Sequence, residues 1–394
     1  MADVCPHLAA APTDVAYHRW YTGVGLEAKW LCVSCSARSR AGQPVELVSV
    51  SDEQRAWIQE EADLDGGYGA PEVKARPEPF EVDLRETPLP WPADEVLDLA
   101  SVGGGWLIAR TDGALFRLTG EAVEPVCVVE RPPAEPPREP WAGHALTARL
   151  HASRDGAFAA IVHDFGHVGR VYDLSSGASV AELDGGDYHA ETVPFSFAFV
   201  EHQGRTVALH RTGWNRLEAL DLHTGDALMS GGRPQLDYFH GRLLVSPDGA
   251  RVLDDGWVWH PHGVPSVWDV DLEAEPQLRR LAWRAHYWNR SLCWLDAERV
   301  AISGIGEDED WMVDGARVFD AADGSELTAF AGPAGRFFGD GERLFAAAPA
   351  GLEVWDVRDG ARVHRIDGFA PTHQHVPERE LVAVTDHRLI RWRY

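Results

Sequence analysis

Three cysteines and a histidine near the N-terminus have the spacing of metal ligands. Cys5 and His7 form a C-x-H pair and Cys32 and Cys35 form a C-x-x-C pair, in a chain with five cysteines. Zinc binds four nitrogen or sulfur ligands in a tetrahedron, and such short spacings let one turn of chain supply two of them. A segment this small buries too little apolar surface to fold alone. We therefore predict a structural Zn²⁺ bound by these four residues.

Two alternatives to this site remain open. His18 would replace His7 if His7 faces away from the cluster. The C-x-x-C pair could instead be redox-active, although such motifs usually lie in a βαβ setting that the sequence does not show. Four protein ligands leave no open coordination position, which argues against a catalytic zinc.

The same stretch resembles the UBP-type zinc finger, the ubiquitin-tail-binding module of some deubiquitinases and deacetylases. The resemblance rests on "CPHL" at residues 5–8 and "WLCVSC" at residues 30–35, which match the start and the W-x-C-x-x-C segment of that family. It implies that a ubiquitin-like tail is a candidate partner of the N-terminal module.

Charge and composition argue against several kinds of partner. The chain has 36 Lys and Arg against 62 Asp and Glu, a formal net charge of −26. Nucleic acids and anionic membranes are polyanions, so we expect neither as a main partner. The sequence lacks a run of about 18 apolar residues and a secretory signal pattern. We therefore expect a cytoplasmic protein with reduced cysteines.

Residues 51–64 are predicted to form a short helix, because Ser51 and Gln54 make a capping box. The following Gly- and Pro-rich stretch breaks that helix. We divide the chain into a zinc-binding module (1–50), a helix with a linker (51–78) and a C-terminal domain (79–394).

The C-terminal domain repeats a short element, in which an apolar residue and Asp end a strand and Gly follows four positions after the Asp. Examples are "VYDLSSG" (171–177), "ALDLHTG" (219–225), "VFDAADG" (318–324) and "VWDVRDG" (354–360). Marker positions, including two worn copies, are Arg117, Asp173, Asp221, Asp269, Asp320, Asp356 and Arg393, with a mean separation of 46 residues. Short strands with a period in the forties are typical of a β-propeller. We predict an all-β protein with a seven-bladed β-propeller.

The blades are expected at residues 96–132, 144–186, 194–232, 239–284, 291–333, 335–369 and 371–394. The last blade is too short for four strands, so its outer strand must come from elsewhere. We predict that "PFEVDL" (79–84) closes the ring by pairing with "HRLIRWRY" (387–394), which would cover an exposed strand edge.

The repeats resemble the WD-repeat family, with literal pairs at Trp268-Asp269 and Trp355-Asp356. This resemblance implies the same propeller fold over about 300 residues. "ALDLHTGDAL" (219–228) also resembles the repeats of quinoprotein dehydrogenases, which are typically exported, calcium-dependent enzymes.

One face of this propeller is expected to carry its function. If strands a to d of each blade run outward from the axis, the b–c loops and d–a connections open on one face, and here they are long and rich in His and aromatic residues. We predict partner binding by Trp214, Tyr238, Trp257, Trp259, His260, Tyr287, Trp288 and Arg290. Each Trp could instead pack between blades.

Two functions follow from these predictions. The first is a non-catalytic interaction scaffold whose protein partner is unidentified. The alternative is a propeller enzyme, a hydrolase or an oxidoreductase, with its active site in the same loops. We favour the scaffold and assign no catalytic residue, because the sequence shows no nucleophile elbow, phosphate-binding glycine loop or catalytic Cys–His signature.

Overall fold

A computed structural model of the chain describes residues 4–10, 15–21, 26–32, 34–35, 38, 44–56, 73–134, 144–228, 237–259, 261–273, 277–309 and 312–394. The chain forms two compact units, Met1–Glu72 and Val73–Tyr394. The described residues are mostly in β-strands. Every helix within these ranges is too short or too polar to cross a bilayer.

The first unit contains a short helix and a hairpin. Helix α1 (Pro6–Ala10) precedes the antiparallel strands β1 (Val15–Tyr21) and β2 (Leu26–Cys32). Val4 and Val48 form an isolated antiparallel bridge, which joins the segment before α1 to the segment after the hairpin.

The predicted helix at residues 51–64 starts as expected. The backbone N–H of Gln54 donates to Ser51 Oγ at 3.2 Å, and the N–H of Ser51 donates to Gln54 Oε1 at 3.2 Å, which is a capping box. Residues 52–56 are helical, and residues 57–64 lie outside the described residues.

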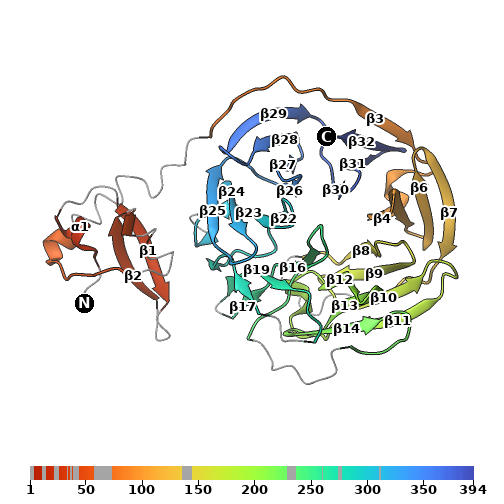
Figure 1. Cartoon of the computed structure of the whole chain (residues 1–394), viewed down its shortest axis with the longest axis horizontal. Helices are drawn as coiled ribbons and strands as arrows, with labels where there is room; N and C mark the ends of the chain where they lie inside the picture. Colours follow the sequence, from red (N-terminus) through yellow and green to blue (C-terminus); the bar gives the residue numbers. More distant parts are fainter. Residues whose placement is uncertain are drawn as a thin grey trace. The chain divides into compact units, whose positions relative to one another are not determined.

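Seven sheets follow one another along the second unit as far as it is described, and they lie around a common centre (Figure 1). Sheet 1 contains β4 (Val96–Val102), β5 (Gly105–Arg110), β6 (Ala114–Thr119) and β7 (Ala122–Val128). Sheet 2 contains β8 (Thr147–Ala152), β9 (Phe158–Asp164), β10 (Val168–Asp173) and β11 (Ser179–Asp184). Sheet 3 contains β12 (Phe197–His202), β13 (Arg205–Gly213) and β14 (Arg216–Asp221). Sheet 4 contains β15 (Leu243–Val245), β16 (Arg251–Asp254), β19 (Ser266–Asp269) and β20 (Arg279–Arg280).

The remaining sheets complete the second unit. Sheet 5 contains β22 (Leu292–Trp294), β23 (Arg299–Ile305), β24 (Val313–Asp320) and β25 (Glu326–Ala331). Sheet 6 contains β26 (Arg336–Gly339), β27 (Arg343–Ala348), β28 (Gly351–Asp356) and β29 (Ala361–Asp367). Sheet 7 contains β30 (His373–His375), β31 (Glu380–Thr385), β32 (Arg388–Arg393) and β3 (Leu84–Pro88). A small extra sheet contains β17 (Trp257–Val258), β18 (His262–Gly263) and β21 (Arg284–Ala285).

Neighbouring sheets pack face to face, because alternate residues of each strand point to opposite sides. Leu107 and Ala109 of β5 pack with residues of sheet 2, whereas Trp106 and Ile108 pack with residues of sheet 7. Buried clusters also join sheets 2 and 3, 3 and 4, 4 and 5, 5 and 6, and 6 and 7. The order of these contacts therefore returns from the last sheet to the first.

The repeated Asp and Gly shape the turns that follow the third strand of a sheet. In sheet 2 the N–H of Ser175 donates to Asp173 Oδ1 at 2.7 Å, and the N–H of Gly177 donates to the Asp173 carbonyl at 2.8 Å. Gly177 has a φ of 71°, a left-handed conformation that costs glycine little. Asp221 and Asp356 bind the backbone N–H two positions later in the same way.

Strand β3, not residues 79–84, completes sheet 7. It pairs antiparallel with β32 along its full length, with Glu86 opposite Ile390, so the predicted position of the closing strand was wrong. Phe80 stacks on His364 with ring centroids 4.8 Å apart, and Val82 packs against the cluster between sheets 6 and 7. These apolar side chains cover that cluster, and strand pairing begins only at Leu84.

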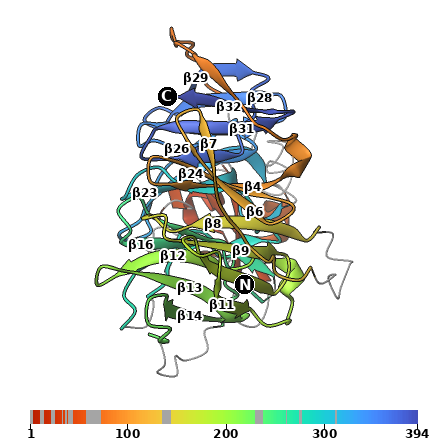
Figure 2. The same ribbon diagram turned by 90° about the vertical axis from the view of Figure 1, so that its right-hand side faces the viewer.

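Part of the predicted linker 51–78 also belongs to the second unit. Arg362 in β29 donates its N–H to the Lys74 carbonyl at 2.9 Å and accepts a hydrogen bond from the Arg76 N–H at 2.9 Å. Arg76 also forms an ion pair with Asp356 at 2.8 Å. Residues 74–78 therefore lie along the outer edge of sheet 6 before the chain continues to β3 (Figure 1 and Figure 2).

Truncations at three positions test this closure. Removing residues 1–72 is expected to leave the melting temperature of the second unit nearly unchanged. Removing residues 1–88 exposes the edge of β32 and the cluster under Phe80, so we expect a loss of about 3 kcal/mol or more of unfolding free energy. Removing residues 1–83 keeps β3 and should give an intermediate value. Circular dichroism melts that coincide for all three proteins would contradict this account.

Candidate metal centre and loop-rich face

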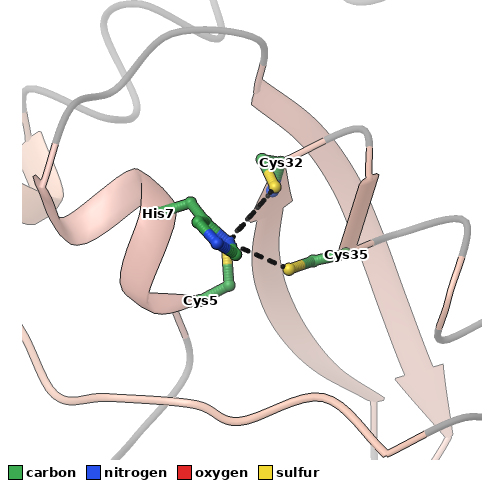
Figure 3. Close-up of side chains that lie close together, drawn as sticks. All are labelled: Cys5, His7, Cys32 and Cys35. Carbon is green, nitrogen blue, oxygen red and sulfur yellow. Dashed lines mark hydrogen bonds between the residues drawn. The ribbon is translucent and has the colours of Figure 1, made fainter.

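The candidate metal ligands come from short segments of the first unit (Figure 3). Cys5 directly precedes α1 and His7 lies in its first turn, while Cys32 ends β2 and Cys35 lies in the helical turn after it. Cys5 and Cys35 are buried in the apolar cluster of this unit, so the ligands form part of its core.

The four ligand atoms lie close enough together to bind a metal ion. All are within 4.8 Å of one another. His7 Nδ1 is 3.3 Å from Cys35 Sγ and 3.8 Å from Cys32 Sγ, and the Cys32 N–H donates to Cys5 Sγ at 3.2 Å. Two ligands of a tetrahedral zinc ion lie about 3.7 Å apart, given the usual metal–ligand distances. The residues therefore fit one tetrahedral ion.

The clustered thiols affect one another's ionisation. Burial, a hydrogen bond with Cys32 and the charges of Cys5 and Cys32 raise the pKa of Cys35. Burial also opposes ionisation of Cys32, but hydrogen bonds from Cys35 and from the backbone of Ser34 outweigh it and lower the pKa of Cys32. A metal cation would stabilise all three thiolates together, and its binding would release protons.

This donor set contains one imidazole and three sulfur atoms. Four protein ligands complete a tetrahedral shell and leave no position for water or a substrate. The alternative ligand His18 lies in β1 opposite Lys29, and its side chain lies outside the described part of the structure.

Two of the residues predicted to contact a partner are buried. Tyr238 is 1% exposed and Trp257 is 2% exposed. The Tyr238 hydroxyl donates to the Val264 carbonyl at 3.0 Å and accepts from the Gly256 N–H at 3.1 Å. Trp257 stacks on Phe239 with ring centroids 4.0 Å apart. Direct partner contact was therefore a wrong prediction for Tyr238 and Trp257, because other loops already cover both rings.

Aromatic side chains from several connections form a continuous cluster, which we call the aromatic stack. Its members are Tyr188, Trp214, Phe239, Trp257, Trp259 and Trp288. Trp214 and Trp288 are partly buried against its centre, and Trp288 Nε1 donates to the Thr192 carbonyl at 3.3 Å. Trp259 is 50% exposed and Tyr188, which the sequence analysis missed, is 51% exposed. The stack thus reaches the surface through these two rings.

Of the other predicted contact residues, Tyr287 and Arg290 lie together. The Tyr287 ring centroid lies 4.8 Å from the guanidinium carbon of Arg290 and 4.9 Å from that of buried Arg284. Arg290 is exposed and forms an ion pair with Glu309. His260 lies outside the described residues.

The sequence analysis also missed a ring of residues near the start of the innermost strand of each sheet. We call these residues the inner ring: Asp98, Arg149, Ser196, Arg242, Ser291, Arg336 and His373. The innermost strands surround the centre of the second unit (Figure 1). Each of these residues except His373 directly precedes a buried apolar residue of its strand, a shared position that the structure reveals.

Hydrogen bonds of the inner ring link neighbouring sheets. The Leu150 N–H donates to Asp98 Oδ2 at 2.8 Å, and His373 Nε2 lies 2.8 Å from Asp98 Oδ1. The Phe337 N–H donates to Ser291 Oγ at 2.6 Å. Burial opposes ionisation of Asp98, but the hydrogen bond and charge of His373 outweigh it and lower the pKa of this carboxyl.

Comparisons with known proteins assign no family to the chain. No protein-family model matches the sequence, and no curated protein sequence matches it. The function is therefore inferred from the metal centre, the aromatic stack and the inner ring.

Replacing one thiol tests the metal centre. Cys32→Ser is expected to abolish binding of a metal ion and to loosen the first unit, since the ion would supply much of its stability. The second unit should melt unchanged. Cys127→Ser, outside the cluster, is the matched control and should keep the ion. Elemental analysis of protein purified without chelators measures the metal, and no metal in the wild type would refute the site.

Proposed function

We propose that the protein is a non-catalytic interaction scaffold. In this proposal a seven-bladed β-propeller of the WD-repeat type binds a protein partner, and a zinc finger stabilises the N-terminal module. The observation that carries the proposal is the aromatic stack. Its members Phe239 and Trp257 are buried, whereas the rings of Trp259 and Tyr188 are half exposed.

Sheet packing supports the propeller. Seven sheets follow the sequence repeat, and their buried clusters return from sheet 7 to sheet 1. The outer strand of the last sheet comes from the segment before the first, which is how a ring of blades avoids a free edge.

The donor set supports zinc as the ion. Three cysteine sulfurs and one histidine nitrogen form a Cys₃His set, and soft thiolate ligands favour zinc over magnesium or calcium. With four protein ligands the ion has a structural role. A ubiquitin-like tail remains the candidate partner of this finger, on the resemblance of its "CPHL" and "WLCVSC" segments alone.

The partner surface is proposed to lie around the exposed end of the aromatic stack. Large rings that are already packed on one side lose little conformational freedom when a partner covers the other, and aromatic residues dominate binding energies at interfaces. The net charge of −26 favours a partner with basic side chains at the rim. The five cysteines are free thiols, which suits the reducing cytoplasm.

An enzyme, a hydrolase or an oxidoreductase, is the second candidate. The observation that favours it is the His373–Asp98 pair of the inner ring, at 2.8 Å, because such a pair can move a proton. This pair lies away from the aromatic stack, so variants of the two sites separate the two functions.

The exposed pair of rings allows a direct test of the scaffold. Tyr188→Ala combined with Trp259→Ala is expected to keep the wild-type melting temperature and to lose proteins that wild-type protein retains from an extract of its host. Leu327→Ala, which truncates an equally exposed apolar side chain on β25, should retain them.

Buried Trp257 provides the contrasting variant. Trp257→Ala should cost about 3–5 kcal/mol of unfolding free energy, since it empties a core site. Quantitative mass spectrometry of retained proteins and thermal melts give the two measurements. If the double variant retains the same proteins as the wild type, the partner surface lies elsewhere.

A further inference from the structure

Three arginines of the inner ring come from sheets that do not touch. Arg149 belongs to β8 of sheet 2, Arg242 directly precedes β15 of sheet 4, and Arg336 begins β26 of sheet 6. Each of these sheets is separated from the next by another sheet, so their side chains can approach one another only across the centre of the ring (Figure 1).

The charges of these three side chains do act on one another. The charge of Arg149 is the largest effect that lowers the pKa of Arg242, and burial is the second. Together with the charge of Arg336, they bring this pKa to about 9. Burial and the charge of Arg149 also lower the pKa of Arg336. The three arginines lie near the starts of innermost strands that surround the centre, and their charges repel one another there.

The three guanidinium groups differ in the hydrogen-bond and ion-pair partners that they have. Arg149 forms an ion pair with Asp164, and Arg336 Nη1 donates to the Thr372 carbonyl at 2.5 Å. The Arg242 side chain makes no hydrogen bond or ion pair with the described part of the chain, and its inaccessible Nε lacks an acceptor. A buried polar group without a partner is costly and needs an explanation.

Acidic residues near the centre do not supply the missing acceptors of the Arg242 side chain. Asp98 is engaged by His373 and by the Leu150 N–H. The charges of Asp164 and Asp255 favour the charged form of Arg242, but Asp164 forms its ion pair with Arg149, and Asp255 Oδ1 lies 3.9 Å from Arg284 Nη2. The centre therefore offers a guanidinium with free donors beside two other cations.

We propose that the centre of the ring binds an oxyanion, the phosphate or carboxylate group of a small molecule, between Arg242, Arg336 and Arg149. A guanidinium presents a planar fork of N–H donors that matches the oxygens of either group. The anion would supply the missing acceptors of Arg242 and relieve the repulsion among the three cations. This inference is independent of the proposed partner surface, because it uses none of the residues of the aromatic stack.

Inorganic phosphate and succinate are suitable probes of the full-length protein. Isothermal titration at constant ionic strength, held with sodium chloride, measures binding, and thermal melts measure stabilisation. We expect one site per chain and a higher melting temperature with the preferred anion, since a ligand bound only by the folded state stabilises it. Tighter binding of phosphate identifies a phosphorylated ligand, and tighter binding of succinate identifies a carboxylate.

Arg242→Gln should weaken binding about tenfold or more, which is the usual contribution of a charge-assisted hydrogen bond. It should also raise the melting temperature of the anion-free protein, because it removes one of three repelling charges. Arg365→Gln, an exposed arginine paired with Asp367 on β29, is the matched control and should bind like the wild type. Arg336→Gln provides a second variant if Arg242→Gln folds poorly.

Two results would overturn the proposal. One is that wild-type protein shows neither a heat of binding nor a higher melting temperature with either anion up to about 10 mM. This concentration is high enough to detect even weak binding. The other is binding that Arg242→Gln and Arg336→Gln leave unchanged, since the anion would then bind elsewhere. Retained anion binding in the Tyr188→Ala, Trp259→Ala double variant separates this site from the partner surface.

Discussion

Each sheet of the second unit has two apolar faces, and the rest of the structure depends on covering both. Strand β5 sends Leu107 toward sheet 2 and Trp106 toward sheet 7, and both residues are completely buried. An open row of such sheets would leave one apolar face at each end in water. The cyclic order of contacts removes both ends. The Trp106 indole also donates to Glu380 at 2.8 Å, a buried hydrogen bond across the junction between sheets 1 and 7.

This arrangement determines the chemistry at the centre. The innermost strands lie around one point but do not form ladders with one another, so side chains must make the connections between them. Asp98 and Ser291 do so by accepting backbone N–H groups of the next sheet. Where the same position carries arginine, the ring concentrates positive charge inside a strongly acidic protein. The centre and the aromatic stack thus differ in chemistry: the first carries arginines and the second carries aromatic rings.

Features with local chemistry could be predicted from the sequence. Asp173 and Gly177 shape one turn with each other, and the four candidate metal ligands come in two short pairs whose spacing indicated that they would lie together. The closing strand was misplaced because Phe80 and Val82 alternate with polar residues, a pattern that fits both strand pairing and packing over a cluster. The structure was needed to choose between the two.

Other features depend on contacts that no spacing reveals. Trp257 lies in β17 and Trp259 directly follows that strand, yet Trp257 is buried and Trp259 is half exposed, because Phe239 stacks closely only on the Trp257 ring. The inner ring was missed for another reason. Its members are Asp, Arg, Ser and His, and only their shared position in the sheets unites them.

The pairing of β3 with β32 also constrains the order in which the protein can assemble. Glu86 and Arg388, joined by a hydrogen bond across these strands, are 302 residues apart in sequence. Residues 74–88 leave the ribosome long before their partners in β29 and β32. The early segment must therefore wait unpaired while sheets 1 to 6 are synthesised, and closure follows only after β32 has been made. Contacts of such long sequence separation slow folding, and the waiting β3 is a strand edge exposed to wrong partners.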